Sequence, residues 1–184
     1  MYIDAVRAND WHAVGDLLRR SAEILARSGA DFCLTPDNAV QHGIHLAESG
    51  SPIPWITMPE MVALAVEADN RKVVGILGTK MVTTGSTYQT HLGIRGIQVL
   101  NPAPEDAEEM DRIIFQELIY GQIYPSSQAR VLEMISRFAD QGCQGVILAS
   151  SEAPLLVTQA NSRLPLYDAA DILAQGAVRA AIAR

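Results

Sequence analysis

GVILASSEAPLL, from Gly145 to Leu156, is the stretch of sequence that decides the expected fold. A short apolar run, residues 146–149, is followed at once by Ser150, Ser151 and Glu152. Such a run predicts a buried strand with polar side chains at its end. In open α/β sheets, ligands bind at the carboxyl ends of the strands. We therefore expect these three polar residues at the edge of a cleft.

Flanking segments extend this pattern along the chain. Helical periodicity predicts helices over residues 10–28, 59–69, 105–121, 126–142 and 169–184, with others near 37–49 and 87–96. Apolar runs predict strands at 30–36, 53–58, 71–79, 97–102, 143–150 and 164–168. Strands that alternate with helices indicate an α/β fold with parallel sheets and right-handed crossovers.

Composition and charge exclude several classes of partner. The chain has 184 residues and a formal net charge of −7, without a stripe of basic residues. It therefore lacks the electrostatic pattern of a nucleic-acid-binding protein. No apolar run reaches the roughly 18 residues of a transmembrane helix, and no leader with a charged start and an apolar centre is recognisable. We expect a cytoplasmic protein with no membrane partner.

The cysteines and histidines do not form a metal-binding pattern. Cys33 and Cys143 are far apart and have no CxxC spacing, which favours two reduced, buried thiols. His42 and His45 share one face of an expected helix close to Asp37, but no third ligand follows at a clear spacing. We expect neither a metal nor a cofactor.

An internal repeat connects two distant parts of the chain. One expected helix stops at Gly29 and another at Gly142, and a strand follows each glycine. Counted from these glycines, Asp37 corresponds to Ser150 and Asn38 to Ser151. A single repeat of this length also arises by coincidence among βαβ units. We favour two duplicated lobes that face each other across a cleft, each presenting one strand end.

Several motifs resemble the aspartate/glutamate racemase family, almost from end to end. These motifs are GADFCLTPDNAV (29–40), VVGILGTKMVTTGSTYQTHL (73–92), DRIIFQELIYG (111–121), GCQGVILASSEAPLL (142–156) and LPLYDAADILAQGAV (164–178). The resemblance implies two pseudo-symmetric, Rossmann-like lobes with parallel sheets. The first lobe would hold residues 1–69 and 166–184, and the second would hold residues 70–165. The closing helix would pack back on the first lobe.

The same resemblance implies cofactor-independent inversion at the carbon next to a carboxylate. In the family, one thiolate removes the α-proton and a second thiol donates a proton from the opposite face. Thiol acidity suits both roles. Here Asp37 and Ser150 stand at the two thiol positions, and the family's first strand and glycine-rich loop are missing before Met1. A serine hydroxyl is a weak acid and a weaker base unless a neighbour activates it.

Further departures lie where the substrate should bind. Ala39 and Val82 replace threonines that are usual in the family, and Gln41 and Leu173 replace common histidines. The scaffold motifs are retained beside these changes. The resemblance therefore implies an intact fold with an altered site.

We assign proton transfer to Asp37 and to the Ser150 position, and carboxylate binding to four residues: Asn38, Thr79, Ser151 and Glu152. Each also has a purely structural interpretation. Asp37 and Asn38 suit an Asx turn and a helix cap, Ser150 and Ser151 suit helix N-caps with Glu152 in the first turn, and Thr79 suits a cap.

The expected activity is racemase-type proton transfer on a small amino or dicarboxylic acid, weak or altered because both thiols are replaced. A decarboxylase or lyase on the same scaffold is an alternative. Another is a non-catalytic module that binds a small acid or acts in assembly. The missing first strand and the apolar closing helix lead us to expect a homodimer.

Overall fold

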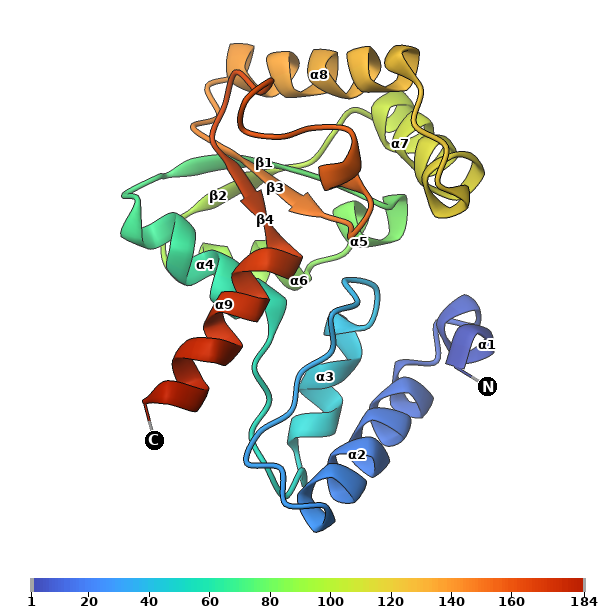
Figure 1. Ribbon diagram of the computed structural model, residues 1–184, viewed down its shortest axis with the longest axis vertical. Helices are drawn as coiled ribbons and strands as arrows, with labels where there is room; N and C mark the ends of the chain where they lie inside the picture. The colour runs from blue at the N-terminus through green and yellow to red at the C-terminus, as the bar shows by residue number, and fades with distance from the viewer. Residues whose placement is uncertain (1, 184) are drawn as a thin grey trace.

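The computed structural model describes residues 2–183, and its centre is one four-stranded parallel sheet (Figure 1). The strands are β1 (Val73–Gly78), β2 (Gln98–Leu100), β3 (Val146–Ala149) and β4 (Leu166–Asp168), in the spatial order β2-β1-β3-β4. Val73 is in register with Gln98, Gly78 with Ala149, and Leu148 with Asp168. The expected α/β fold with parallel strands is confirmed.

The two central strands are apolar along their whole length. Every residue of β3 is buried, and so is every residue of β1 after Val73. Parallel strands have this composition because helices cover both faces of the sheet. A Cβ on Gly75 would lie 2.6 Å from the ring of Phe138, so this close helix–strand contact requires a glycine.

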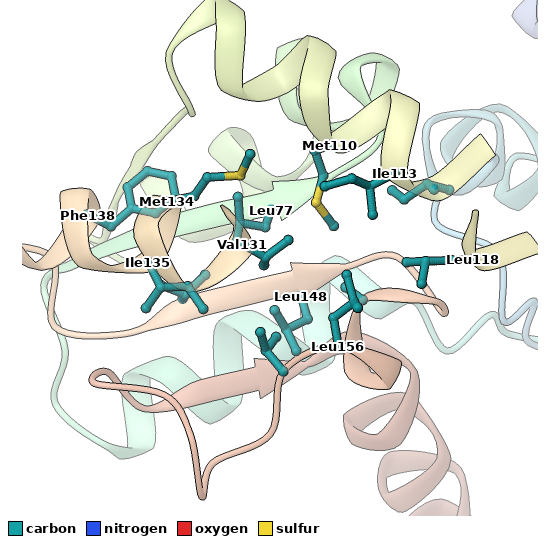
Figure 2. Packing of buried hydrophobic residues seen from close by; sticks show 14 of the residues in the cluster. Leu77, Met110, Ile113, Leu118, Val131, Met134, Ile135, Phe138, Leu148 and Leu156 are labelled. Atoms are coloured by element: carbon teal, nitrogen blue, oxygen red, sulfur yellow. The ribbon is translucent and has the colours of Figure 1, made fainter. Parts of the chain in front are cut away.

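Helices α7 (Pro104–Gln116) and α8 (Pro125–Asp140), with the 3₁₀ turn η1 (Leu118–Tyr120), cover one face of the sheet (Figure 1). Figure 2 shows their apolar side chains meeting those of β1 and β3. The labelled residues of this cluster are Leu77, Met110, Ile113, Leu118, Val131, Met134, Ile135, Phe138, Leu148 and Leu156. Asp106 on α7 accepts two hydrogen bonds from the guanidinium of Arg137 on α8, at 2.9 and 2.6 Å. This bidentate ion pair joins the two helices above the core.

Helices α4 (Met58–Ala68), α6 (Thr87–Gly93) and α9 (Ala169–Ile182) cover the opposite face. Their buried cluster includes Val62 of α4, Leu92 of α6 and Leu173 of α9, packed against Ile76 and Ile147 of the sheet. The closing helix α9 packs directly on α4. A short helix that the sequence did not predict, α5 (Lys80–Thr84), follows β1 immediately.

The N-terminal region, residues 2–57, consists mainly of helices α1 (Tyr2–Arg7), α2 (Trp11–Arg27) and α3 (Gln41–Glu48). Helices α2 and α3 pack tightly: a Cβ on Gly15 would lie 2.7 Å from Cβ of Leu46, and one on Gly43 would lie 2.6 Å from Cγ1 of Val14. Figure 1 shows this helix pair away from the sheet, at the opposite end of the view from α8.

The strands expected at 30–36 and 53–58 are not formed as continuous strands. They meet only at one isolated parallel bridge, between Cys33 and Trp55. Backbone bonds run there from Cys33 N to the Pro54 carbonyl and from Ile56 N to the Cys33 carbonyl. Pro36 and Pro54 have no N–H group, and no third strand pairs with the two segments within residues 2–183. The first of the two expected sheets is therefore reduced to a bridge.

The division into two lobes stays a prediction. Strand β4, which lies in the segment 166–184 assigned to the first lobe, hydrogen-bonds to β3 of the second. Helix α4, also assigned to the first lobe, contributes to the core of the sheet. Met1 and Arg184, at the outer limits of the proposed first lobe, lie outside the described residues.

Candidate functional site

A cavity of about 730 Å³ lies where the N-terminal region meets the carboxyl ends of β1 and β3. Its lining includes α1, the loop before α3, the first residues after β1 and β3, and part of α7. All six sequence-predicted site residues line it: Asp37, Asn38, Thr79, Ser150, Ser151 and Glu152. Sheet topology explains part of this grouping, because parallel strands place their carboxyl ends, here those of β1 and β3, at one edge of a sheet.

Both carboxylate oxygens of Asp37 accept hydrogen bonds. The Tyr2 hydroxyl donates to Oδ2 at 2.5 Å, and the backbone N–H of Ala39 donates to Oδ1 at 2.8 Å. Burial raises the pKa of the Tyr2 phenol above its ordinary value, and the bond to Asp37 and that residue's negative charge raise it further. Tyr2 is therefore a protonated donor at neutral pH. The Ala39 contact is the Asx turn that the sequence suggests, so the turn and a place in the cavity coexist.

Asn38 is buried, with 8% of its surface exposed, and its two polar atoms differ in their contacts. Its Oδ1 accepts a 2.6 Å hydrogen bond from the Tyr88 hydroxyl, whereas its Nδ2 is buried without a partner among the described residues. Burial also raises the pKa of Tyr88, with a smaller contribution from the charge of Asp168, so Tyr88 remains a donor. The amide is thus fixed through its oxygen, and its donor group is left unpaired.

Thr79 supplies a second donor without a partner, its side-chain hydroxyl. Its Oγ1 is buried and has no hydrogen-bond partner within residues 2–183. Thr79 stands at the N-cap position of α5, but its side chain makes no capping bond. The capping interpretation therefore does not account for this hydroxyl. The preceding residue must be a glycine, since a Cβ on Gly78 would lie 2.5 Å from the Ala149 carbonyl oxygen.

Ser150 and Glu152 form a hydrogen-bonded pair at the end of β3. The Ser150 hydroxyl, 5% exposed, donates to Oε2 of Glu152 at 2.7 Å, and it accepts from the Glu152 backbone N–H at 3.2 Å. Ser151 is exposed. The segment after these residues is a 3₁₀ turn, η2 (Ala153–Leu155), without a side-chain cap. The structural interpretation of Ser150 and Ser151 as N-caps of a helix therefore does not describe these residues.

The comparisons with known proteins agree with this architecture. The model of the Asp/Glu/Hydantoin racemase family matches residues 2–177. The chain belongs to this family. A solved structure of a Yersinia pestis protein assigned to the Asp/Glu racemases is similar at 26% identity and a TM-score of 0.93, covering 98% of this chain and 79% of that one.

Other racemase structures share the fold. An aspartate racemase homologue from Pyrococcus horikoshii has 26% identity and a TM-score of 0.83, over 91% of this chain and 74% of its own. A glutamate racemase from Francisella tularensis, in complex with D-glutamate, has 15% identity and a TM-score of 0.68, over 92% and 64%. The sequence-based assignment to the racemase family is confirmed, and so is the fold class.

In this racemase-family chain, both cysteines lie outside the lining of the cavity. Cys33 is buried at the bridge to Trp55, and its thiol contacts the Pro54 carbonyl at 3.7 Å. Cys143 is buried in the core under α8. Neither thiol can reach a substrate in the cavity without a rearrangement of the chain. The cavity instead presents Ser150 at the end of β3 and Asp37 in the loop before α3.

Histidines do not assemble a metal centre with Asp37. The ring of His42 packs edge-on against Trp11, with ring centroids 4.8 Å apart, and its Nδ1 lies 3.4 Å from the Thr87 hydroxyl. His45 lines a different pocket, beside Trp55. Across residues 2–183, no three His, Cys, Asp or Glu side chains are grouped as metal ligands. No helix in the same range is long and apolar enough to cross a membrane.

Sequence reasoning gave no role to several residues of the site. Tyr2 and Tyr88 hold Asp37 and Asn38, and Asp111 of α7 adds a further carboxylate to the lining. Tyr88 is part of a quoted family motif, which is a usable signal. Tyr2 precedes the first periodic segment and gives no signal of its own.

Proposed function

We propose that this racemase-family chain transfers a proton at the carbon next to the carboxylate of a small amino or dicarboxylic acid, without a cofactor. The observation that carries the proposal is the meeting of Asp37 and Ser150 in one cavity, each at the position where the resemblance implies a catalytic thiol. The rate and stereochemistry are expected to differ from those of a two-thiol enzyme.

Two buried donors supply a binding site for the carboxylate. Asn38 and Thr79 both line the cavity, and Asn38 Nδ2 and Thr79 Oγ1 are buried without a partner within the described chain. A buried polar group without a hydrogen bond costs about 1–3 kcal/mol. A carboxylate accepts from both donors and removes this cost, and it places the adjacent carbon near Asp37. Donors of this kind also stabilise the enolate-like transition state.

In the proposed reaction, the α C–H bond breaks and Asp37 takes the proton. The electron pair is delocalised into the substrate carboxylate. Return of a proton from Asp37 restores the same configuration, whereas return from the Ser150 side inverts it. Because a serine hydroxyl is a weak acid even beside Glu152, we expect exchange with solvent to be faster than inversion.

The test is deuterium incorporation at the α-carbon of aspartate, glutamate and related acids, followed by NMR in D₂O. Replacement of Asp37 by asparagine removes the proton acceptor, so Asp37→Asn should lower the exchange rate by roughly 10²–10⁴-fold. Asp140→Asn, at an exposed carboxylate on α8, is the matched control. Exchange that survives Asp37→Asn unchanged would refute the assigned role.

Ser150→Cys tests the second position. A thiol at the end of β3 would supply the proton donor that serine lacks, so inversion should rise relative to exchange. Circular dichroism with a single enantiomer measures inversion directly. No gain over the parent chain in either quantity would count against a latent racemase site.

A second candidate is a module that binds a small acid without turnover. The geometry of Asp37 favours it, since both oxygens of this carboxylate are already engaged, by Tyr2 and by Ala39. Calorimetry with small acids separates the two functions: binding with no exchange on the same ligands would identify the non-catalytic module.

We also propose a homodimer formed through α4 and α9. Leu64, Val178 and Ile182 are exposed apolar residues of these helices, at 42%, 57% and 77% exposure. Analytical ultracentrifugation of the full chain at micromolar concentration tests this proposal. A single monomeric species would contradict it.

A further inference from the structure

We infer that the cavity selects a monocarboxylate with a large apolar group on its α-carbon, in preference to aspartate, glutamate or another dicarboxylate. This inference rests on the proposed function, because it names the substrate class of the same site. It comes from three observations about the cavity: the apolar wall in its lining, its charge and its size.

The wall is built from apolar side chains of separate elements. They are Ile3 and Val6 of α1, Met81 of α5, Ile114 and Phe115 of α7, and Ile119 of η1. Although they are apolar, Phe115 and Ile119 are 53% and 49% exposed. An apolar substituent that covers them is favoured by about 25 cal/mol per Å² of surface removed from water. A carboxylate at the same place would lose its hydration without gaining a partner.

The charges of the lining disfavour a second carboxylate. Asp37, Asp111 and Glu152 are acidic, and in the described part of the chain Arg7 is the one basic side chain of the lining. Arg7 is exposed. Lys80 is close in sequence, but its ammonium group pairs with Glu108, and only its backbone N–H reaches Asp111. A dicarboxylate would bring two negative charges to a cavity with this acidic excess.

The cavity is also larger than a short dicarboxylate needs. Its volume, about 730 Å³, falls within the range of about 300–1,000 Å³ found for pockets that hold ligands of drug size. The donors Asn38 and Thr79 and the apolar residues of α7 and η1 line the same cavity. An acid whose carboxylate binds Asn38 and Thr79, and whose substituent reaches the apolar residues of α7 and η1, contacts both sets of residues.

The experiment compares matched acids by calorimetry on the full chain. The pairs are 2-phenylpropionate with 2-methylsuccinate, and phenylalanine with aspartate. The apolar member should bind about ten-fold tighter, which corresponds to about 1.4 kcal/mol. Equal or tighter binding of the dicarboxylates would overturn the inference, and so would the absence of binding by every apolar acid.

Two isoleucine variants test the wall itself. Ile119→Ser should weaken binding of 2-phenylpropionate by about ten-fold and leave propionate binding unchanged. Ile123→Ser is the matched control, because Ile123 is exposed to a similar extent, 51%, and does not line the cavity. Thermal melts establish that both variants fold. Equal effects of the two substitutions would overturn the role of the wall.

Arg7→Met tests whether the second carboxylate of a dicarboxylate binds to Arg7, the basic side chain of the lining. If aspartate or 2-methylsuccinate bound through Arg7, this variant would weaken its binding, and that result would contradict the inference. The proposed proton transfer and the proposed substrate class can also be refuted independently of each other. Tight binding of apolar acids without α-proton exchange would refute proton transfer alone, whereas rapid exchange on aspartate without apolar binding would refute the substrate class alone.

Discussion

The sheet region, residues 58–183, and the N-terminal region, residues 2–57, hold their parts of the candidate site by different means. In the sheet region, β1 and β3 pair as parallel strands, and their backbone hydrogen bonds fix the strand ends that precede Thr79 and Ser150. In the N-terminal region, Asp37 and Asn38 follow a segment with one isolated bridge. The part of the cavity formed by Thr79 and Ser150 is therefore held by paired strands, whereas the part formed by Asp37 and Asn38 is held by side-chain contacts.

In the N-terminal region, the segment that holds Asp37 and Asn38 is fixed by three side chains instead of by paired strands. Gln41 donates to the carbonyls of Thr35 and Asp37 at 3.1 and 2.9 Å, and it accepts from the Met58 N–H at 3.0 Å. Tyr2 binds the Asp37 carboxylate, and Tyr88 binds Asn38. Because individual contacts of this kind open more readily than a packed sheet, the two regions should differ in local stability.

The largest expected effect comes from truncation of the sheet core. Ile147 of β3 is fully buried, and Ile147→Ala should lower the free energy of unfolding by about 2–5 kcal/mol, since it leaves a cavity between the sheet and its helices. Urea denaturation followed by circular dichroism measures this change.

The matched variant in the other region is Ile44→Ala. Ile44 of α3 is 1% exposed, so its truncation also leaves a void, but hydrogen exchange should accelerate mainly in α2 and α3. If the amides of β1 and β3 accelerated equally, the two regions would form one cooperative unit and the comparison would fail.

The next largest loss of stability is expected where the ends of β1 and β3 are in contact. Gly78→Ala would force a Cβ within 2.5 Å of the Ala149 carbonyl oxygen, so the strands must separate. We expect a loss of about 1–3 kcal/mol in stability and weaker acid binding, because Thr79 and Ser150 move with the strands. Gly93→Ala is the control: nothing lies within 4 Å of its Cβ position in α6. A tolerated Gly78→Ala would show that the strand ends do not fix the site.

Loss of the Gln41 contact between the two regions should have an effect of the same order. Gln41→Ala removes three hydrogen bonds to the backbone around Asp37 and α4, which should cost about 1–3 kcal/mol. Binding of acids should weaken as well, because the Asp37 loop loses its support. Gln116→Ala, at an exposed position of α7, should change neither quantity. Unaltered ligand binding in Gln41→Ala would show that Tyr2 and Tyr88 hold the loop without it.

The same contrast explains what the sequence could predict. Apolar runs at 73–78 and 146–149 predict strands correctly because both are buried on two faces, a property written in consecutive residues. The runs around Cys33 and Trp55 look similar, but a strand also needs a neighbour to pair with, and the neighbour is a tertiary property. Local patterns therefore overpredicted the N-terminal sheet.

The polar residues of the cavity were predictable for a related reason. Asp37, Thr79 and Ser150 each follow an apolar run, and the sheet topology brings Thr79 and Ser150 to one edge. Tyr2 reaches Asp37 from 35 positions away in the chain, and Tyr88 reaches Asn38 from 50. These long-range contacts depend on how α1 and α6 pack, which no local pattern contains.

The smallest expected effect uses the two thiols as reporters, one in each region. Burial, with a contribution from the charge of Glu48, raises the pKa of Cys33 from its ordinary value of 9.0 to about 11, and burial also raises the pKa of Cys143. Both should react slowly with an aromatic disulfide reagent at pH 8, since the thiolate is the nucleophile. Between about pH 9 and 11 the unfolded chain loses the Cys33 proton first, so this group's contribution to stability falls as the pH rises.

Single-cysteine chains, made with Cys143→Ala or Cys33→Ala, separate the two rates. Cys33 and Cys143 are 4% and 5% exposed, so static burial predicts similar reactivity. Local opening predicts otherwise: Cys33 lies at the single bridge of the N-terminal region and should react several-fold faster in native buffer than Cys143, which lies in the core under α8. In denaturing urea the difference should vanish. If Cys143 reacted first in native buffer, the sheet region would have the lower local stability of the two, which would contradict the expected difference between the regions.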